Sequence, residues 1–324
     1  MADLTQALVQ QAHSVLDPAS PQARLIDRLG DAMYVAATIV CVLVVTVLLW
    51  ATFRRRGSAV TPDHPGRERP MRTAVVVATG LTIAVLFGFL IFDISVGRAI
   101  TSNPGKDAIQ IRVTGHQWWW EVQYRDSLPQ NWVTTANEIH VPVGHPVVFE
   151  LRSADVIHSF WPPNLSAKRD QIPGDENSLW FQADSAGTFR GLCAEFCGHQ
   201  HAKMDFLVVA ESPNSFASWL ARQRDTALTP TDSASLRGQQ VFLGSSCVMC
   251  HAIAGTPAGS RIGPDLTHLA SRLTIAAGTL ANNRSNLTGW IVDPQVIKPG
   301  VRMPPSQLSG PDLLALVTYL ESLK

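Results

Sequence analysis

The sequence predicts a multidomain membrane protein in which a two-helix transmembrane hairpin is followed by an all-β domain and then by an all-α domain. Three observations indicate this fold class: two uncharged apolar runs near the start, β-branched and aromatic runs broken by turn residues in the middle, and helical apolar periodicity at the end. The 324 residues carry no formal net charge. We therefore expect no nucleic-acid partner, because such proteins present clustered positive charge.

The predicted hairpin spans residues 33–92. It follows an N-terminal segment, residues 1–32, that lacks the basic start and short apolar stretch of a signal peptide. Residues 33–53 and 73–92 each supply about twenty uncharged residues, which is enough to cross a hydrocarbon core of roughly 30 Å. Both runs are therefore expected to be transmembrane helices in contact with membrane lipids.

The loop between the two runs, residues 54–72, holds six arginines against Asp63 and Glu68. The positive-inside rule places this loop in the cytoplasm, so the N-terminus and all residues after the hairpin should lie on the outer face of the membrane. Cys41 falls in the middle of the first run and reads as an inert thiol.

The all-β domain is assigned to residues 106–210, where helical periodicity is absent and Pro, Gly and Asn separate short β-branched and aromatic runs. Such runs are typical of the strands of a small sandwich or barrel. The predicted strands are 109–113, 138–141, 147–151, 179–182, 187–192 and 206–209.

This domain contains a cluster of soft ligands. Cys193, Cys197, His201 and Met204 lie within twelve residues of one another, and two thiolates, an imidazole and a thioether suit copper far better than magnesium or calcium. A second imidazole has to come from elsewhere in the chain. The candidate is His158, which lies just after an apolar strand.

Two alternatives remain open at this point. Cys193 and Cys197 could form a structural disulfide, which is common outside the cytoplasm but explains neither His201 nor Met204. His199 competes with His201 as the imidazole of the cysteine loop.

Residues 211–234 are predicted to be a short helix and a linker. Ser212 is placed to cap the helix, with Pro213 in its first turn, and residues 225–235 are polar, as linkers are. About a dozen flexible residues would reach roughly 20 Å and keep the last domain near the all-β domain.

The all-α domain, residues 235–324, contains the motif Cys247-Val248-Met249-Cys250-His251. This spacing is typical of covalent haem attachment, in which Cys247 and Cys250 bind the vinyl groups and His251 is one axial iron ligand. A redox-active cysteine pair or half of a zinc site is the alternative. Met303 is the methionine left for the second axial position, in a proline-stiffened loop.

Residues 235–324 resemble class I cytochrome c throughout. A short helix at 236–243 precedes the attachment loop, and Ser309 with Pro311 begins a final amphipathic helix. The resemblance implies that the carbonyl of Pro264 orients the haem-ligating histidine and that Trp290 contacts a haem propionate.

From the hairpin through residue 210 the chain resembles subunit II of cytochrome c oxidase, which carries the binuclear copper centre CuA on a cupredoxin domain. The resemblance rests on Gly115-His116-Gln117-Trp118-Trp119-Trp120, the segment around His158, residues 168–174 and the cysteine loop. The resemblance implies that Cys193 and Cys197 bridge the two coppers and that His158 and His201 are the terminal ligands. It implies that Met204 is a weak thioether ligand and that the Glu195 carbonyl is a further ligand, while the Glu195 side chain reaches magnesium at the subunit I boundary. Trp118 would be the exposed ring where electrons enter.

A subunit II with a fused cytochrome c resembles the caa3-type oxidases of bacterial inner membranes. The resemblance implies an electron-input subunit of a proton-pumping terminal oxidase. Haem c would accept electrons from a soluble or membrane cytochrome c or from complex III, and CuA would pass them to the haem-copper site of subunit I, where oxygen becomes water. Other oxidase subunits are further expected partners.

The charges of the two extramembrane domains support docking between them. Residues 106–210 hold eight basic and twelve acidic residues, whereas residues 235–324 hold seven and four. Opposite net charges favour association. We expect haem c to be reduced before CuA.

Two other functions stay open: a membrane-anchored copper carrier or redox sensor, and a CuA donor subunit of a nitric or nitrous oxide reductase. Metal content and the catalytic partner separate them from an oxidase. Glu68 is the nearest candidate for a glutamate that many subunit II sequences place at a proton channel, but flanking arginines favour an ordinary loop residue.

Overall fold

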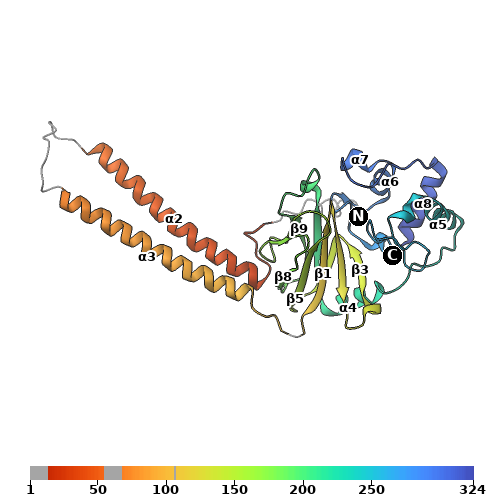
Figure 1. Ribbon diagram of the computed structural model, residues 1–324, viewed down its shortest axis with the longest axis horizontal. Helices are drawn as coiled ribbons and strands as arrows, with labels where there is room; N and C mark the ends of the chain where they lie inside the picture. The colour runs from red at the N-terminus through yellow and green to blue at the C-terminus, as the bar shows by residue number, and fades with distance from the viewer. Residues whose placement is uncertain (1–13, 55–67, 106) are drawn as a thin grey trace. The chain divides into compact units, whose positions relative to one another are not determined.

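The computed structural model describes residues 14–54, 68–105 and 107–324. These residues form two compact units, one of which is Arg24–Ser102, while the other contains the remaining segments. The predicted fold class is confirmed, because two apolar helices, a β-sandwich and a helical C-terminal region follow one another along the chain (Figure 1).

The two apolar helices are α2, Pro21–Phe53, and α3, Glu68–Ile100. Each has 33 residues, and in the most apolar window of each no residue is buried within the protein. At 1.5 Å per residue each helix is about 50 Å long, longer than a hydrocarbon core of roughly 30 Å. Both helices are long and apolar enough to cross a membrane.

The first helix begins earlier than the apolar run predicts. Residues 21–32 were expected in the N-terminal segment, but they continue α2, whose start is capped by the Ser20 hydroxyl at 2.9 Å from the Ala23 amide. Most of the predicted cytoplasmic loop, residues 55–67 with Asp63, lies outside the described residues, so its orientation stays a prediction.

The middle of the chain is a sandwich of two five-stranded sheets. In the first sheet the order is β3-β2-β1-β5-β8, with β1 parallel to β5 and antiparallel to β2. The second has the order β4-β10-β9-β6-β7. The strands are β1 Ile109–His116, β2 Trp119–Arg125, β3 Val133–Ala136, β4 Glu138–Pro142, β5 Val147–Ser153, β6 His158–Trp161, β7 Arg169–Gln171, β8 Asn177–Phe181, β9 Gly187–Cys193 and β10 Asp205–Glu211.

The sandwich core is aromatic and ends at the cysteine loop. Phe160 and Phe206 stack with ring centroids 4.4 Å apart, and Trp120 meets both rings edge-on. The same buried cluster includes Cys193, Cys197 and Met204. The rigid core therefore positions the candidate metal ligands.

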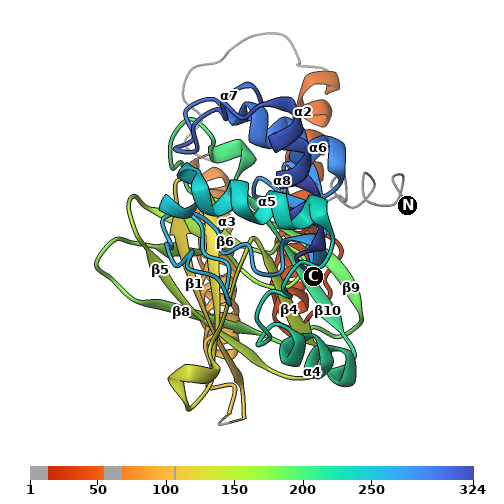
Figure 2. The same cartoon turned by 90° about the vertical axis from the view of Figure 1, so that its right-hand side faces the viewer.

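The C-terminal region is helical, and Figure 2 shows its helices α5, α6, α7 and α8 together. Asp232 caps α5, and Ser309 caps α8 as predicted. Helices α5 and α8 pack closely, since a Cβ atom at Gly238 would lie 2.1 Å from the Ala315 carbonyl oxygen. The helices from residue 213 onward are α4 Pro213–Arg222, α5 Ser233–Gly244, α6 Arg284–Val292, α7 Pro294–Ile297 and α8 Gly310–Ser322; the short strands are β11 Thr274–Ile275 and β12 Leu280–Ala281.

The expectation of a freely flexible linker is wrong for much of residues 225–235. His268 Nε2 lies 3.1 Å from the Asp225 carbonyl oxygen, and the Ala227 amide donates to the Ala254 carbonyl at 3.0 Å. Because these backbone groups find partners on the helical region, the segment lies along that region and does not hang free.

Candidate metal centre and haem site

The predicted copper ligands come together at one end of the sandwich. His158 starts β6, Cys193 ends β9, and Cys197, His201 and Met204 follow in the loop that leads into β10. The Cys193 and Cys197 sulfurs are 3.8 Å apart. His158 Nδ1 lies 3.9 Å from the Cys193 sulfur, while His201 Nδ1 and the Met204 sulfur each lie 3.7 Å from the Cys197 sulfur.

The two cysteines are free thiols in the structure, not the disulfide that the sequence left open. Hydrogen bonding from the Cys197 thiol and from His158 lowers the pKa of Cys193, although burial opposes ionisation. A buried thiolate between a thiol, an imidazole and a thioether suits a soft metal. The donor set therefore fits a copper pair.

Two other residues of the cysteine loop, Glu195 and His199, were also candidates for the copper site. The Glu195 carbonyl oxygen lies 3.2 Å from the Cys193 sulfur, and Glu195 is exposed. His199 is exposed, whereas His201 Nδ1 lies 3.7 Å from the Cys197 sulfur. The structure thus favours His201 over His199 as the imidazole of the loop.

Local backbone pairing explains why these side chains converge. Phe160 on β6 is paired with Cys193 on β9, and the Cys193 amide donates to the Met204 carbonyl at 3.0 Å. Gly115 makes room for the histidine, because a Cβ atom there would lie 2.7 Å from His158 Cδ2. Strand register and one small residue therefore fix the site.

Asp155 is a functional residue that the sequence analysis missed. Its carboxylate lies 2.9 Å from His158 Nε2 and accepts hydrogen bonds from the amides of Gln117 and Val156. Burial opposes ionisation, but these hydrogen bonds lower the pKa of Asp155 to about 2. Engaging Nε2 leaves Nδ1 facing the sulfurs, which is how a carboxylate orients a ligating histidine. The available signal was an acid three residues before His158.

Trp118 corrects an expectation. The resemblance implied an exposed ring, but Trp118 is only 9% exposed. Its indole Nε1 donates to the Cys197 carbonyl at 3.0 Å, and Gln117 Nε2 donates to the same oxygen at 2.8 Å. The edge of the ring at Cη2 is close to the helical region, since a Cβ atom at Gly300 would lie 4.0 Å from Trp118 Cη2. Trp118 therefore adjoins both the cysteine loop and the region that carries the haem motif.

The haem motif occupies the turn after α5. Cys247 lies within the 3₁₀ turn Ser246–Met249 and Cys250 directly follows it, and both are half-buried. The His251 amide donates to the Cys247 carbonyl at 3.0 Å. His251 Nδ1 lies 2.7 Å from the Pro264 carbonyl oxygen, as the resemblance implies. This hydrogen bond assigns the proton to Nδ1 and leaves Nε2 for iron. Burial lowers the pKa of His251, which favours the neutral ligand form.

The methionine loop is shaped by Gln295. Its side-chain amide donates to the Val301 and Met303 carbonyls at 2.8 and 2.9 Å, and Met303 itself is half-buried. Trp290 on α6 packs partly buried against the helical core. The axial role of Met303 and the propionate role of Trp290 stay predictions.

Arg272 shows that the region fits a haem. The residue is 8% exposed, and its Nη2 donates to the Asp265 carbonyl at 2.5 Å. Its Nε has no hydrogen-bond partner among the described residues. His251 is bonded to the carbonyl of Pro264, the residue before Asp265, so adjacent carbonyls of one segment hold the two side chains. A buried guanidinium beside the ligating histidine suits the acidic propionates of a haem.

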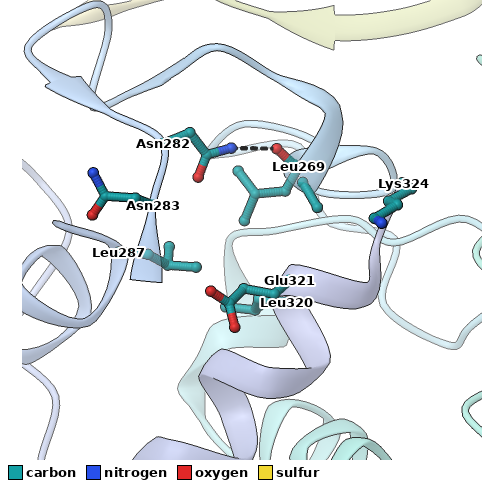
Figure 3. A pocket seen from close by; sticks show the side chains of 8 residues that line it. Leu269, Asn282, Asn283, Leu287, Leu320, Glu321 and Lys324 are labelled. Atoms are coloured by element: carbon teal, nitrogen blue, oxygen red, sulfur yellow. Dashed lines mark hydrogen bonds between the residues drawn. The ribbon is translucent and has the colours of Figure 1, made fainter. Parts of the chain in front are cut away.

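We assign a structural role to a separate pocket in the helical region. Leu269, Leu287 and Leu320 line it together with polar side chains, among them Asn282 (Figure 3). The Asn282 amide is already engaged, because it donates to the Leu269 and Arg272 carbonyls at 2.8 and 2.9 Å. These contacts tie the segment before α6 to the rest of the helical region.

Comparisons with known proteins agree with this architecture. Residues 128–211 match a family model described as cytochrome c oxidase subunit II, periplasmic domain, and residues 235–324 match one described as cytochrome c. Cytochrome c oxidase subunit 2 of Alkalihalophilus pseudofirmus is 35% identical over 330 residues, covering 99% of this chain and 94% of the relative.

Two further similarities concern other bacteria. Cytochrome c oxidase subunit 2 of Bacillus sp. strain PS3 is 33% identical over 266 residues, covering 78% of this chain and 73% of that relative. The crystal structure of the periplasmic domain of subunit II of cytochrome oxidase from Bradyrhizobium japonicum is 32% identical, with a TM-score of 0.35, and covers 38% of this chain and 97% of that one.

Proposed function

This chain belongs to the cytochrome c oxidase subunit 2 family, and we propose that it takes electrons at a haem c held by Cys247 and Cys250 and passes them through a copper pair to subunit I of a terminal oxidase. A cytochrome c domain on a subunit 2 indicates an electron-input role. The haem-copper site, where oxygen becomes water, lies in subunit I and not in this chain.

One observation carries the proposal: the donor atoms of Cys193, Cys197, His158, His201 and Met204 form a closed cluster in which neighbouring atoms lie 3.7–3.9 Å apart. A copper pair held by these side chains would supply one-electron transfer with little rearrangement. Both cysteines belong to the buried core of the sandwich and are 2% exposed, so a substrate has little access to their sulfurs. Such a site relays electrons and does not carry out bond chemistry.

Contacts between the sandwich and the helical region support intramolecular transfer. The Gln200 side chain donates to the Pro299 carbonyl at 2.7 Å, and the Leu273 amide donates to Glu138 at 2.8 Å. Among the ion pairs of the described residues, Arg302 meets Asp155 across this interface at 3.8 Å. Two acidic side chains of the sandwich, Glu138 and Asp155, take part in these contacts, and the contribution of opposite net charge to docking stays a prediction.

The covered Trp118 ring indicates the order of reduction. Electrons that enter the copper domain at Trp118 would have to arrive from the helical region, because that region adjoins the ring. We therefore propose that haem c is the first acceptor and that the separate donor, a soluble or membrane cytochrome c or complex III, docks on the haem domain.

Further details of the proposal follow the family resemblance. The exposed Glu195 side chain is free to reach a magnesium ion at the boundary with subunit I. The chain is anchored by α2 and α3, with its copper and haem domains on the outer face of a bacterial inner membrane. Glu68 is exposed at the start of α3, between the flanking arginines, and we assign it no channel role.

Metal content tests the function. We expect the purified intact complex to hold two coppers of this centre per haem c and to show the near-infrared band of a mixed-valence copper pair, measured by elemental analysis, haem assay and absorption. One labile copper per haem c would instead indicate a copper carrier or sensor. The catalytic subunit that co-purifies, assayed with oxygen, nitric oxide and nitrous oxide, distinguishes an oxidase from the two reductases.

A further inference from the structure

Lys298 is the most completely buried basic side chain of the interface between the two domains. It follows α7 in the methionine loop and is 1% exposed. Its ammonium group donates to the Trp118 carbonyl at 3.0 Å, the Lys203 carbonyl at 2.8 Å and the Ala276 carbonyl at 3.1 Å. The first two acceptors belong to the copper domain and the third to the haem domain, so one side chain joins both.

These hydrogen bonds satisfy every N–H donor of the buried ammonium group, whose burial costs free energy. A buried ammonium ion loses its hydration, and its burial is tolerated only where its N–H groups find acceptors. A lysine has three N–H donors, and Lys298 has one acceptor for each. Burial lowers the pKa of Lys298 to about 7, with the charge of Asp205 opposing the shift.

The backbone that receives Lys298 is in a conformation that alanine rarely adopts. Ala276 and Ala277 have φ values of 54° and 56°, in the left-handed region. In this turn the Ala276 carbonyl accepts from Lys298, and the Ala277 carbonyl accepts from the Asp205 amide of the copper domain at 3.1 Å. Two adjacent strained residues thus present their carbonyls to the interface.

The acceptors on the copper domain lie next to the metal ligands. Lys203 lies between His201 and Met204 in the chain, and Trp118 donates its indole N–H to the Cys197 carbonyl at 3.0 Å. Lys298 itself is five residues before Met303, the predicted axial ligand of the haem. The lysine therefore connects the loop of one redox site to the backbone that supports the other.

We propose that Lys298 is a positioning residue for electron transfer, which locks the methionine loop of the haem domain onto Trp118 and the cysteine loop of the copper domain. The inference rests on the proposed relay from haem c to the copper pair. Without the lysine, the other contacts between the domains and the covalent connection keep the domains together, but the methionine loop loses its hydrogen bonds to the backbone of Trp118 and Lys203.

The test is Lys298→Met in the intact, fully loaded oxidase, which keeps the length of the side chain and removes its donors. Haem c is reduced by a pulse from a photoexcited ruthenium complex, and its reoxidation and the near-infrared copper band are followed. We expect transfer to the copper pair to slow ~10-fold or more, because loss of a buried hydrogen-bonded charge destabilises the docked pose. The slowed step should also slow further in glycerol, since it waits for the domain to dock again.

Lys324→Met is the matched control, because Lys324 is the other lysine of the haem domain and is exposed. It should transfer electrons at the unchanged rate. Midpoint potentials of both centres, titrated in the same samples, separate lost docking from a changed driving force. A Lys298→Met complex with both centres loaded and an unchanged rate would overturn the proposal, whereas absence of transfer in the unmodified complex would overturn the proposed function instead.

If the Lys298→Met complex does not load its cofactors, chemical labelling of the lysines in the unmodified complex tests the proposal instead. An acetylating pulse followed by mass spectrometry should modify Lys324 readily and leave Lys298 protected, as its burial requires. Equal labelling of the two lysines would show that Lys298 is not held in the interface, and the proposal would be wrong.

Discussion

Cys197→Ser is expected to remove the copper pair and to lower oxygen consumption with a cytochrome donor at least ~100-fold, while haem c stays attached and reducible. Loss of residues that merely orient a ligand costs ~10–100-fold in metal affinity or activity, and Cys197 is itself a predicted ligand. Its sulfur lies within 3.8 Å of the Cys193 sulfur, His201 Nδ1 and the Met204 sulfur, so no other donor of the cluster is as central. A hydroxyl is a harder and weaker ligand for copper than a thiolate.

The measurements are copper content, the near-infrared band, haem c reduction and oxygen uptake in the purified complex. Cys41→Ser is the matched control, because it makes the same substitution at a cysteine of α2 that belongs to neither site. A Cys197→Ser complex that keeps both coppers and normal turnover would show that this sulfur does not bridge them.

Met303→Leu should leave the haem attached through Cys247 and Cys250 but remove its second axial ligand. Leucine fills a similar volume without a sulfur, so the protein fold should persist. We expect a high-spin ferric spectrum and a midpoint potential lower by roughly 0.1–0.2 V, a modest part of the ~0.8 V range that axial ligands span. Absorption spectra and a potentiometric titration of haem c measure both effects.

Met249→Leu provides the comparison for this experiment. Met249 lies inside the attachment motif and is 68% exposed, so its replacement should leave the spin state and the potential unchanged. If Met303→Leu has the spectrum and potential of the unmodified protein, another group is the ligand.

Much of the fold could be predicted because its signals are local. Ser212 and Ser309 each cap a helix, as their spacing to the following proline indicates, and the two apolar runs are helical. Four strands of the sandwich were missed, β2, β3, β6 and β7, although β2 carries Trp120 and β6 carries His158. The place of β6 depends on pairing with β9, which is far away in the sequence, and short runs do not reveal such pairing.

The residues of the candidate site also fall into those that the sequence predicts and those that it does not. Ligand types and loop spacing pointed to Cys193, Cys197, His201 and Met204, and the structure brings His158 to them across the sheet. The burial of Trp118 and the roles of Asp155 and Lys298 could not be predicted, because each depends on a contact that only the folded chain creates. An acid in a loop and a lysine before a proline are ordinary sequence features.

The central claim is that electrons pass from the fused haem domain to the copper pair. Rapid mixing of the oxidised complex with a reduced soluble cytochrome c, followed at the haem c α-band and in the near infrared, tests it most directly. The account predicts that haem c is reduced first and that the copper band then decays as haem c is partly reoxidised. Reduction of the copper pair before haem c would contradict it.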